Sequence, residues 1–296
     1  MRRIGFAFNP TREATFALRD RALAWCAEHG VNAWAAESGA YDELVAHLAG
    51  TDCLVVLGGD GTFLRAARAL ARVDVPVLGV NSGRVGFLSK AEPESLERVL
   101  GELVAGSYSL EPRMMLEAHL LRGGVSVGLP GAGGGLPAAG AGGSADGPFA
   151  ALNDAAVVRG AQVRVIHLEM SIDGSHVATW LADGVVVATP TGSTAYSFSA
   201  GGPILDPTAR NLVVTPIAAY LSAVRSIVVG PQHRVLVRVL DGGDCVVSID
   251  GREDHPLAVG DAVEVRALER PLRLIEPTDA LPFWELLRRK SALLPT

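Results

Sequence analysis

One carboxylate set among glycines, Gly58-Gly59-Asp60-Gly61-Thr62, is the stretch of the sequence best suited to carry chemistry. Three glycines allow the backbone to bend sharply and let a phosphate or a ribose approach the main chain closely. A single acid in such a turn is held in place and points toward whatever is bound. A tight turn with a solvated aspartate explains the same residues, and neither the dinucleotide fingerprint nor the Walker lysine pattern is present.

The residues on either side predict a turn from a strand to a helix. Residues 53–57 form a short apolar run rich in branched side chains, which is typical of a buried parallel strand. The helix predicted to begin near Thr62 has apolar residues at helical spacing. Because open α/β folds bind ligands at the carboxyl ends of their strands, Asp60 is expected at such an edge.

The pattern around this turn predicts an N-terminal α/β domain with a mostly parallel sheet. Strands are expected at residues 4–8, 31–36, 53–57 and 75–80, and helical patterns alternate with them. Residues 1–110 are assigned to this domain, joined by a C-terminal tail at 277–296 that carries a helix around Phe283. Residues 111–276 are assigned to a β-rich C-terminal domain.

Period-two alternation predicts the strands of the second domain. Asp173-Gly174 indicates a hairpin turn, residues 241–244 indicate another, and residues 272–275 continue the pattern as a late strand. The segment 123–147 is rich in Gly, Ala and Pro and has almost nothing to bury, so it is interpreted as a flexible insert between two strands.

Composition narrows the class of protein. Of 296 residues, 49% are hydrophobic and 20% are charged, as in a soluble globular chain, and the net charge of −6 argues against nonspecific binding to nucleic acid or an anionic membrane. The three cysteines, Cys26, Cys53 and Cys245, form neither a disulfide framework nor a zinc pattern, so a cytoplasmic location is predicted. The histidines show no metal-ligand spacing, and no metal-ligating residues are assigned.

Three more polar segments are candidates for a site. The loop from Asn81 to Leu88 leaves a strand at the same edge of the sheet as Asp60. Phe87 in this loop either packs against a planar ring of a ligand or is buried in the core. Asn153-Asp154 precedes a Val-rich strand and either binds a ligand or ends an edge strand. Residues 190–203 predict a turn followed by a short helix that Ser193 or Thr194 caps. The start of this helix either binds an anion or a ribose, or the segment is an ordinary surface helix.

Taken together, these motifs resemble those of NAD kinases, which phosphorylate the adenosine ribose 2′-hydroxyl of NAD. The glycine turn alone is shared with lipid kinases of the diacylglycerol type and with phosphofructokinases, whereas the run Thr191-Gly192-Ser193-Thr194-Ala195-Tyr196 is specific to this family. Asp183-Gly184, Val214-Thr215-Pro216-Ile217 and Ser248-Ile249-Asp250-Gly251 also match. The resemblance spans nearly the whole chain except the insert.

The resemblance implies a role for each matching residue. Asp60 is the catalytic acid beside the reacting hydroxyl, Asn153 and Asp154 bind ribose hydroxyls, and Asp183 lies near the nicotinamide. The other implied substrate-binding residues are Gly61, Phe87 near the adenine, Thr194, Ala195, Tyr196, Ser199 and Ala218. Two departures from the family pattern leave local contacts open: Ala219-Tyr220 stands where Pro-His is usual, and Arg252 where glutamine is common.

The resemblance also implies the rest of the activity. NAD and ATP are the expected small-molecule substrates, with polyphosphate as an alternative donor, Mg²⁺ or another divalent cation as cofactor, and a homodimer or homotetramer as the assembly. Two alternatives stay open from the residues: a lipid kinase, which would need a membrane-binding surface, and a dinucleotide sensor without activity. Retention of Asp60 argues against the sensor.

Overall fold

The computed structural model describes residues 1–82, 86–122, 145–161 and 164–292, and the chain divides into two compact units. The first unit contains residues 1–113 together with 271–296, and the second contains residues 114–270. The predicted domain boundaries fall after residues 110 and 276, whereas the chain passes between the two units after residues 113 and 270. The reason is that strands β5 and β18 pair with each other inside the first unit.

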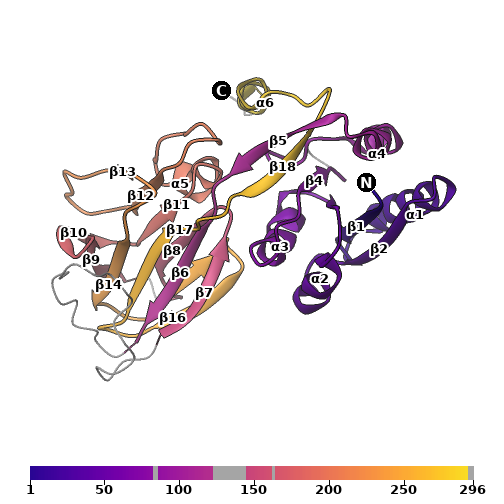
Figure 1. The fold of residues 1–296 in the computed structure, drawn as a ribbon. Coiled ribbons are helices and arrows are strands. Elements are labelled where there is room, and N and C mark those ends of the chain that lie inside the picture. The colour runs from indigo at the N-terminus through magenta and orange to yellow at the C-terminus, as the bar shows by residue number, and fades with distance from the viewer. Residues whose placement is uncertain (83–85, 123–144, 162–163, 293–296) are drawn as a thin grey trace. The chain divides into compact units, whose positions relative to one another are not determined.

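A six-stranded sheet in the order β2-β1-β3-β4-β18-β5 forms the first unit. All neighbouring strands run parallel except β18 and β5, which confirms the predicted α/β class (Figure 1). The prediction that residues 272–275 belong to the second domain is wrong, because β18 inserts between β4 and β5. The strands are β1 (Arg3–Phe8), β2 (Asn32–Glu37), β3 (Cys53–Leu57), β4 (Val77–Val80), β5 (Tyr108–Arg113) and β18 (Leu272–Pro277).

Helices cover both faces of this sheet. One face of β3 (Cys53, Val55 and Leu57) shares a core with α1 and α4, and the α2–α3 pair lies on the other face (Figure 1). A left-handed glycine, Gly106 with φ of 75°, ends α4. The helices are α1 (Glu13–Glu28), α2 (Tyr41–Leu48), α3 (Asp60–Leu70), α4 (Leu96–Ala105) and α6 (Phe283–Ala292), with a 3₁₀ turn at Pro93–Ser95.

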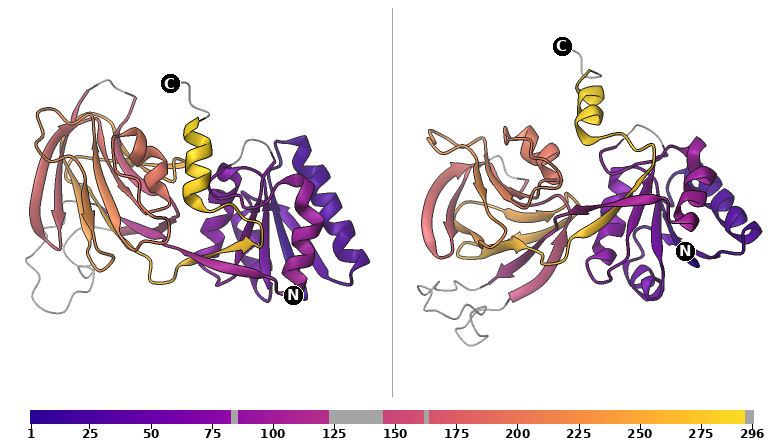
Figure 2. Two further views of the ribbon diagram at one scale, coloured as in Figure 1. Left: turned by 90° about the horizontal axis from the view of Figure 1, so that it is seen from above. Right: turned by 45° about the horizontal axis from the view of Figure 1, so that its top comes forward.

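Two six-stranded sheets form the second unit, which confirms the predicted β-rich class (Figure 2). One sheet has the order β10-β9-β14-β17-β6-β7, and the other β13-β12-β11-β8-β15-β16. Their inward side chains share one apolar core that includes Trp180, Val157 and Val247. The strands are β6 (Leu116–Leu121), β7 (Ala145–Ala151), β8 (Asp154–Arg159), β9 (Ile166–Ile172), β10 (Ser175–Ala182), β11 (Gly184–Ala188), β12 (Leu212–Ile217), β13 (Ile227–Val229), β14 (Val235–Asp241), β15 (Cys245–Ile249), β16 (Glu253–Leu257) and β17 (Ala262–Ala267).

One of the two predicted hairpins forms. Asp173 and Gly174, with φ of 50° and 81°, join the antiparallel strands β9 and β10. Residues 241–244 do not make a hairpin, because β14 belongs to one sheet and β15 to the other. Local alternation cannot distinguish a turn within a sheet from a crossing between two sheets, so only the packed sandwich decides this.

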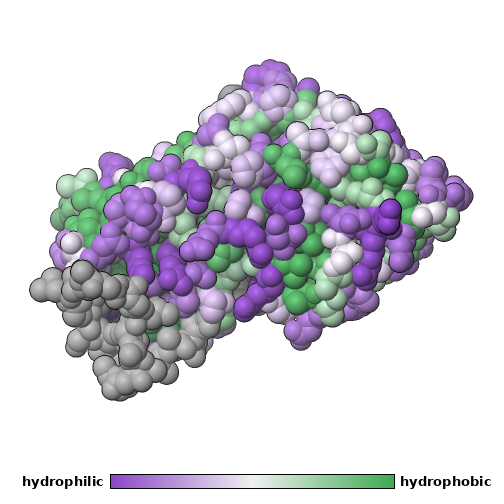
Figure 3. Space-filling model, viewed as in Figure 1, coloured by the Kyte–Doolittle hydropathy of each residue, from purple (hydrophilic) through white to green (hydrophobic). Residues whose placement is uncertain are grey.

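The predicted insert falls mostly outside the described residues, since 123–144 are not described. Its last residues, 145–147, belong to β7, which pairs with β6 so that Ala145 lies opposite Leu121. No helix in the described part of the chain is long and apolar enough to cross a membrane. Hydrophilic and hydrophobic residues are interspersed on the molecular face of Figure 3.

Candidate functional site

The glycine turn lies where β3 passes into α3. β3 ends at Leu57, and α3 begins at Asp60, two residues before the predicted start, so the acid lies in the first helical turn. Gly58 has φ of 155°, and a Cβ added there would lie 2.5 Å from Oγ1 of Thr62. The turn therefore requires glycine at this position, and it places Asp60 at the carboxyl end of a buried parallel strand.

The carboxylate of Asp60 is bound by the loop that follows β4. Oδ2 accepts a hydrogen bond from the backbone N–H of Phe87 at 2.8 Å, and Oδ1 accepts one from Leu88 at 3.1 Å. A Cβ added to Gly86 would lie 1.8 Å from Oδ1 of Asp60. Glycine at 86 thus lets the loop reach the carboxylate, and the half-buried acid has a defined orientation.

Other residues predicted near this turn have partners of their own. Gly61 follows Asp60 in the first turn of α3 and is half-buried. The guanidinium of Arg65 donates from Nε to Oγ of Ser38 at 3.0 Å, so this arginine is held against the first unit. Arg65 and Arg84 follow this turn in the sequence as cations that could meet the charge of a phosphate donor, and Arg84 lies outside the described residues.

In the second unit, the Asn153-Asp154 turn is held by a buried carboxylate, Asp250. Its oxygens accept the backbone N–H groups of Leu152, Asn153 and Asp154 at 3.0, 2.8 and 3.1 Å. Asp250 has φ of 52°, a left-handed conformation that brings its side chain back toward this turn. β8 lies between β11 and β15, so the alternative of an edge-strand terminator is wrong for Asn153-Asp154.

The Pro190–Gly192 turn packs against the backbone of the Asn153-Asp154 turn. Thr189 donates from its N–H to the carbonyl of Asn153 at 2.8 Å and from its hydroxyl to the carbonyl of Leu152 at 2.5 Å. A Cβ on Gly192 would lie 2.1 Å from the carbonyl oxygen of Asn153. The Asn153-Asp154 and Pro190–Gly192 turns are therefore in backbone contact, and glycine is required for that contact.

A cavity of about 680 Å³ opens beside these turns. Its floor is the outer face of β8 and β15, where Ala156, Val158 and Ser248 alternate with the inward core residues. These small side chains leave space above the sheet. The full lining is Asn153, Asp154, Ala156, Val158, Arg159, Gly160, Ala161, Ala195, Tyr196, Val246, Ser248, Asp250, Gly251 and Asp254.

Carboxylates dominate the electrostatics of this cavity. Asp154 is 5% exposed, and burial, followed by the charge of Asp250, raises its pKa to about 7. Burial also raises the pKa of Asp250, although the three N–H donors and the charge of Arg252 oppose that rise. The pKa of Tyr196 is raised by partial burial and then by the carboxylates of Asp154 and Asp183. Asp154 is thus a poorly solvated acid facing an open cavity.

The remaining predicted residues are distributed unevenly around the cavity. Ala195 and Tyr196 line it, and Asp183 adjoins it through an ion pair in which Nε of Arg159 lies 2.9 Å from Oδ1. Ala218, which has φ of 48°, lines a different cavity of about 310 Å³. Thr194 and Ser199 belong to the same helical segment but are not among the described lining residues of either cavity.

The short helix of the 190–203 segment differs from its prediction. A 3₁₀ turn at Gly192–Thr194 precedes α5 (Tyr196–Ser199), and neither has a side-chain cap. The hydroxyls of Ser193 and Thr194 instead donate to the carbonyls of Pro190 and Thr191, at 2.6 and 3.2 Å. These hydroxyls therefore stabilise the turn, and the predicted capping role is wrong.

Sequence reasoning missed two side chains that shape this site. Asp250 was noted only within a motif, yet it holds the Asn153-Asp154 turn, and its position directly after an alternating strand was the available signal. Arg159 lines the cavity and pairs with Asp183, but a lone arginine at the end of a strand carries no distinctive pattern. Arg252, one of the two departures from the family pattern, places a positive charge near Asp250.

Comparison with known proteins identifies the family. The ATP-NAD kinase N-terminal domain matches residues 22–108, and the ATP-NAD kinase C-terminal domain matches residues 152–277. The chain belongs to the ATP-NAD kinase family. It is a phosphotransferase acting on NAD, as predicted from the sequence, and the lipid-kinase alternative is set aside.

Relatives of high identity are NAD kinases, and two solved structures share the fold. The NAD kinase of Symbiobacterium thermophilum is 42% identical over 81% of this chain and 78% of its own length. That of Pseudomonas aeruginosa is 40% identical over 81% and 75%. Yeast NADH kinase complexed with NADH has a TM-score of 0.79 at 24% identity, covering 99% of this chain and 87% of that one. An Archaeoglobus fulgidus NAD kinase in complex with ATP has a TM-score of 0.75 at 23% identity, covering 99% and 100%.

Proposed function

We propose that Asp60 is the acid of this NAD kinase that orients the adenosine ribose 2′-hydroxyl and accepts its proton as the phosphoryl group is transferred. The observation that supports this role is its carboxylate, held by two backbone N–H groups in the glycine turn. Each oxygen keeps a lone pair for a substrate hydroxyl, because a carboxylate accepts about four hydrogen bonds. Phosphoryl transfer has a loose transition state, so positioning accounts for most of the catalysis.

NAD recognition is proposed for the cavity of the second unit. Asp154 is buried and lines the cavity, so ribose hydroxyls of a bound NAD would donate hydrogen bonds to its carboxylate. Asn153 and Tyr196 line the same space, and Asp183 joins it through Arg159. We assign Phe87, Gly61, Thr194, Ser199 and Ala218 to substrate binding on the family resemblance.

ATP is the phosphoryl donor that the family implies, and polyphosphate is an alternative donor. A divalent cation such as Mg²⁺ would neutralise the donor's charge. Within the described ranges, no group of three His, Cys, Asp or Glu side chains forms a metal cluster. Mg²⁺ does not require such a cluster, because it is commonly held by substrate phosphates with one or two carboxylates and keeps several waters.

We propose a homodimer or homotetramer in the cytoplasm. Support for assembly comes from large apolar side chains left in solvent on the second unit, Phe198, Tyr220 and Leu221, which are 51%, 68% and 86% exposed. The three cysteines are free and buried, as expected in a reducing compartment. Light scattering of the purified chain tests the assembly, and a monomer at micromolar concentration would contradict it.

The catalytic role is tested by Asp60→Asn and Asp60→Ala, with NADP formation from NAD, ATP and Mg²⁺ as the assay. Asn keeps the size of the side chain but cannot accept the proton, so turnover should fall about 10²-fold or more while NAD affinity by calorimetry changes little. Ala should lower turnover further. Near-normal turnover of Asp60→Asn would refute proton acceptance, and loss of NAD binding in both variants would make the turn structural.

A further inference from the structure

The aromatic ring beside the catalytic acid is held by the C-terminal helix. The centroid of the Phe87 ring lies 5.8 Å from that of Phe283, with an interplanar angle of 41°. Nζ of Lys290 lies 4.3 Å from the centroid of the same ring, within the range of a cation–π contact. Both partners belong to α6, far along the chain from the loop that they contact.

Phe87 connects the ring contact with α6 to the carboxylate of Asp60. Phe87 donates its backbone N–H to Asp60, and the next residue, Leu88, donates to the other carboxylate oxygen. A restraint on the ring of Phe87 therefore also limits the motion of the backbone segment that carries both donors. On the preceding side the backbone also approaches the carboxylate closely, since a Cβ added to Gly86 would lie 1.8 Å from Oδ1 of Asp60.

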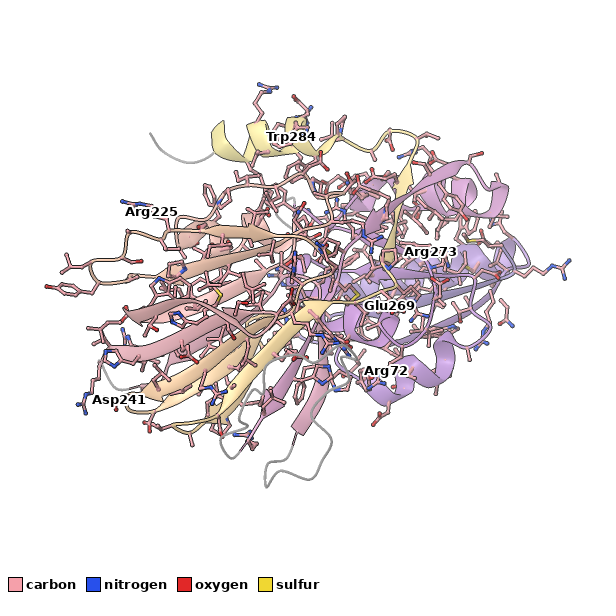
Figure 4. All side chains as sticks on the ribbon, turned by 60° about the vertical axis from the view of Figure 1, so that its left-hand side comes forward. Arg72, Arg225, Asp241, Glu269, Arg273 and Trp284 are labelled. Atoms are coloured by element: carbon pink, nitrogen blue, oxygen red, sulfur yellow. The ribbon has the colours of Figure 1, made fainter. Side chains whose placement is uncertain are left out.

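We propose that Phe283 and Lys290 are positioning residues, which fix the Phe87 ring and through its backbone set the orientation of the Asp60 carboxylate. This inference rests on the proposed catalytic role of Asp60. Phe283 is 9% exposed and in edge contact with Trp284, whose ring centroid is 5.0 Å away, so its own ring is restrained. Figure 4 shows Trp284 on α6, which follows β18 of the first unit.

A purely structural role for α6 is the competing explanation. Leu286, on the same helix, is 4% exposed, so α6 is also held by apolar burial that does not depend on the aromatic pair. Loss of the helix would then lower stability and activity together. The two explanations differ in whether the amides of Phe87 and Leu88 become less protected while the folded protein remains intact.

The test compares Phe283→Leu and Lys290→Met with Arg289→Met, because Arg289 lies on the same helix and pairs with Glu285 at 3.0 Å. Hydrogen exchange at the Phe87 and Leu88 amides and steady-state kinetics are measured for each. Phe283→Leu should accelerate exchange and lower kcat by about 5-fold, and Lys290→Met should do so by about 3-fold. KM for NAD should change less than kcat, and all three variants should remain folded, with Phe283→Leu the least stable because Phe283 is buried.

Conservative variants complete the test. Phe283→Tyr and Lys290→Arg keep the ring and the cation, so both should restore exchange and kcat toward the parent values. Unchanged amide exchange in Phe283→Leu and Lys290→Met refutes the positioning role, whatever the activity. Faster exchange with unchanged kcat refutes its catalytic consequence. If the parent chain forms no NADP, the proposed function fails, and the exchange data still decide whether α6 orders the loop.

Discussion

Replacing Asp154 with asparagine should stabilise the free protein while weakening its binding of NAD. The carboxylate is 5% exposed, and burial with the nearby charge of Asp250 raises its pKa to about 7. An unfolded aspartate has a pKa of about 3.9, so the folded state binds the extra proton between about pH 4 and pH 7. Stability therefore falls as pH rises through this window and then stays level.

The size of the effect follows from linkage. Because the folded state holds the proton more tightly than the unfolded state, Asp154 destabilises the fold by roughly 4 kcal/mol at pH 8 and by roughly a third of that at pH 5. Asp154→Asn removes this penalty, so its Tm without NAD should exceed the parent value by up to about 10 °C at pH 8, and by much less at pH 5. NAD affinity should fall about 10- to 100-fold, because a hydrogen bond to a charged group is lost.

Thermal unfolding at pH 5 and pH 8, with calorimetry of NAD binding, measures both effects. Asp254→Asn is the matched control, since Asp254 lines the same cavity but is exposed, and its Tm should not change. The reasoning is refuted if Asp154→Asn is no more stable than the parent at pH 8, or if its advantage does not shrink at pH 5. Unchanged NAD affinity would separately refute the binding role.

Two further predictions concern the backbone of the second unit. Gly192→Ala should lower the free energy of unfolding by about 3 kcal/mol or more, because its Cβ would lie 2.1 Å from the Asn153 carbonyl oxygen, whereas Gly101→Ala, with nothing within 4 Å, should not destabilise; a chemical-denaturation midpoint shared by the two variants would contradict this. Replacing residues 123–144 with a short Asn-Gly turn should leave Tm and kcat nearly unchanged, since Leu121 already pairs with Ala145. Loss of soluble protein or of most activity would show that the segment does more than connect β6 and β7.

Features that depend on near neighbours in the chain were predictable from the residues alone. The buried run of β3 followed by glycines predicts a strand-to-helix turn, because branched apolar residues suit a parallel strand and glycine suits a sharp bend. Asp173-Gly174 predicts a hairpin for a similarly local reason. The order of the motifs along the chain was enough to indicate the kinase family, which comparison with known proteins confirmed.

Tertiary structure alone decided which distant segments meet. Residues 272–275 read locally like any strand of the second domain, yet β18 joins the first sheet because its pairing partners, β4 and β5, lie there. Asp250 and the Asn153-Asp154 turn are far apart in sequence, and hydrogen bonds across the folded sheet unite them. The raised pKa of Asp154 likewise depends on burial, a property of the packed fold that residue type and spacing do not contain.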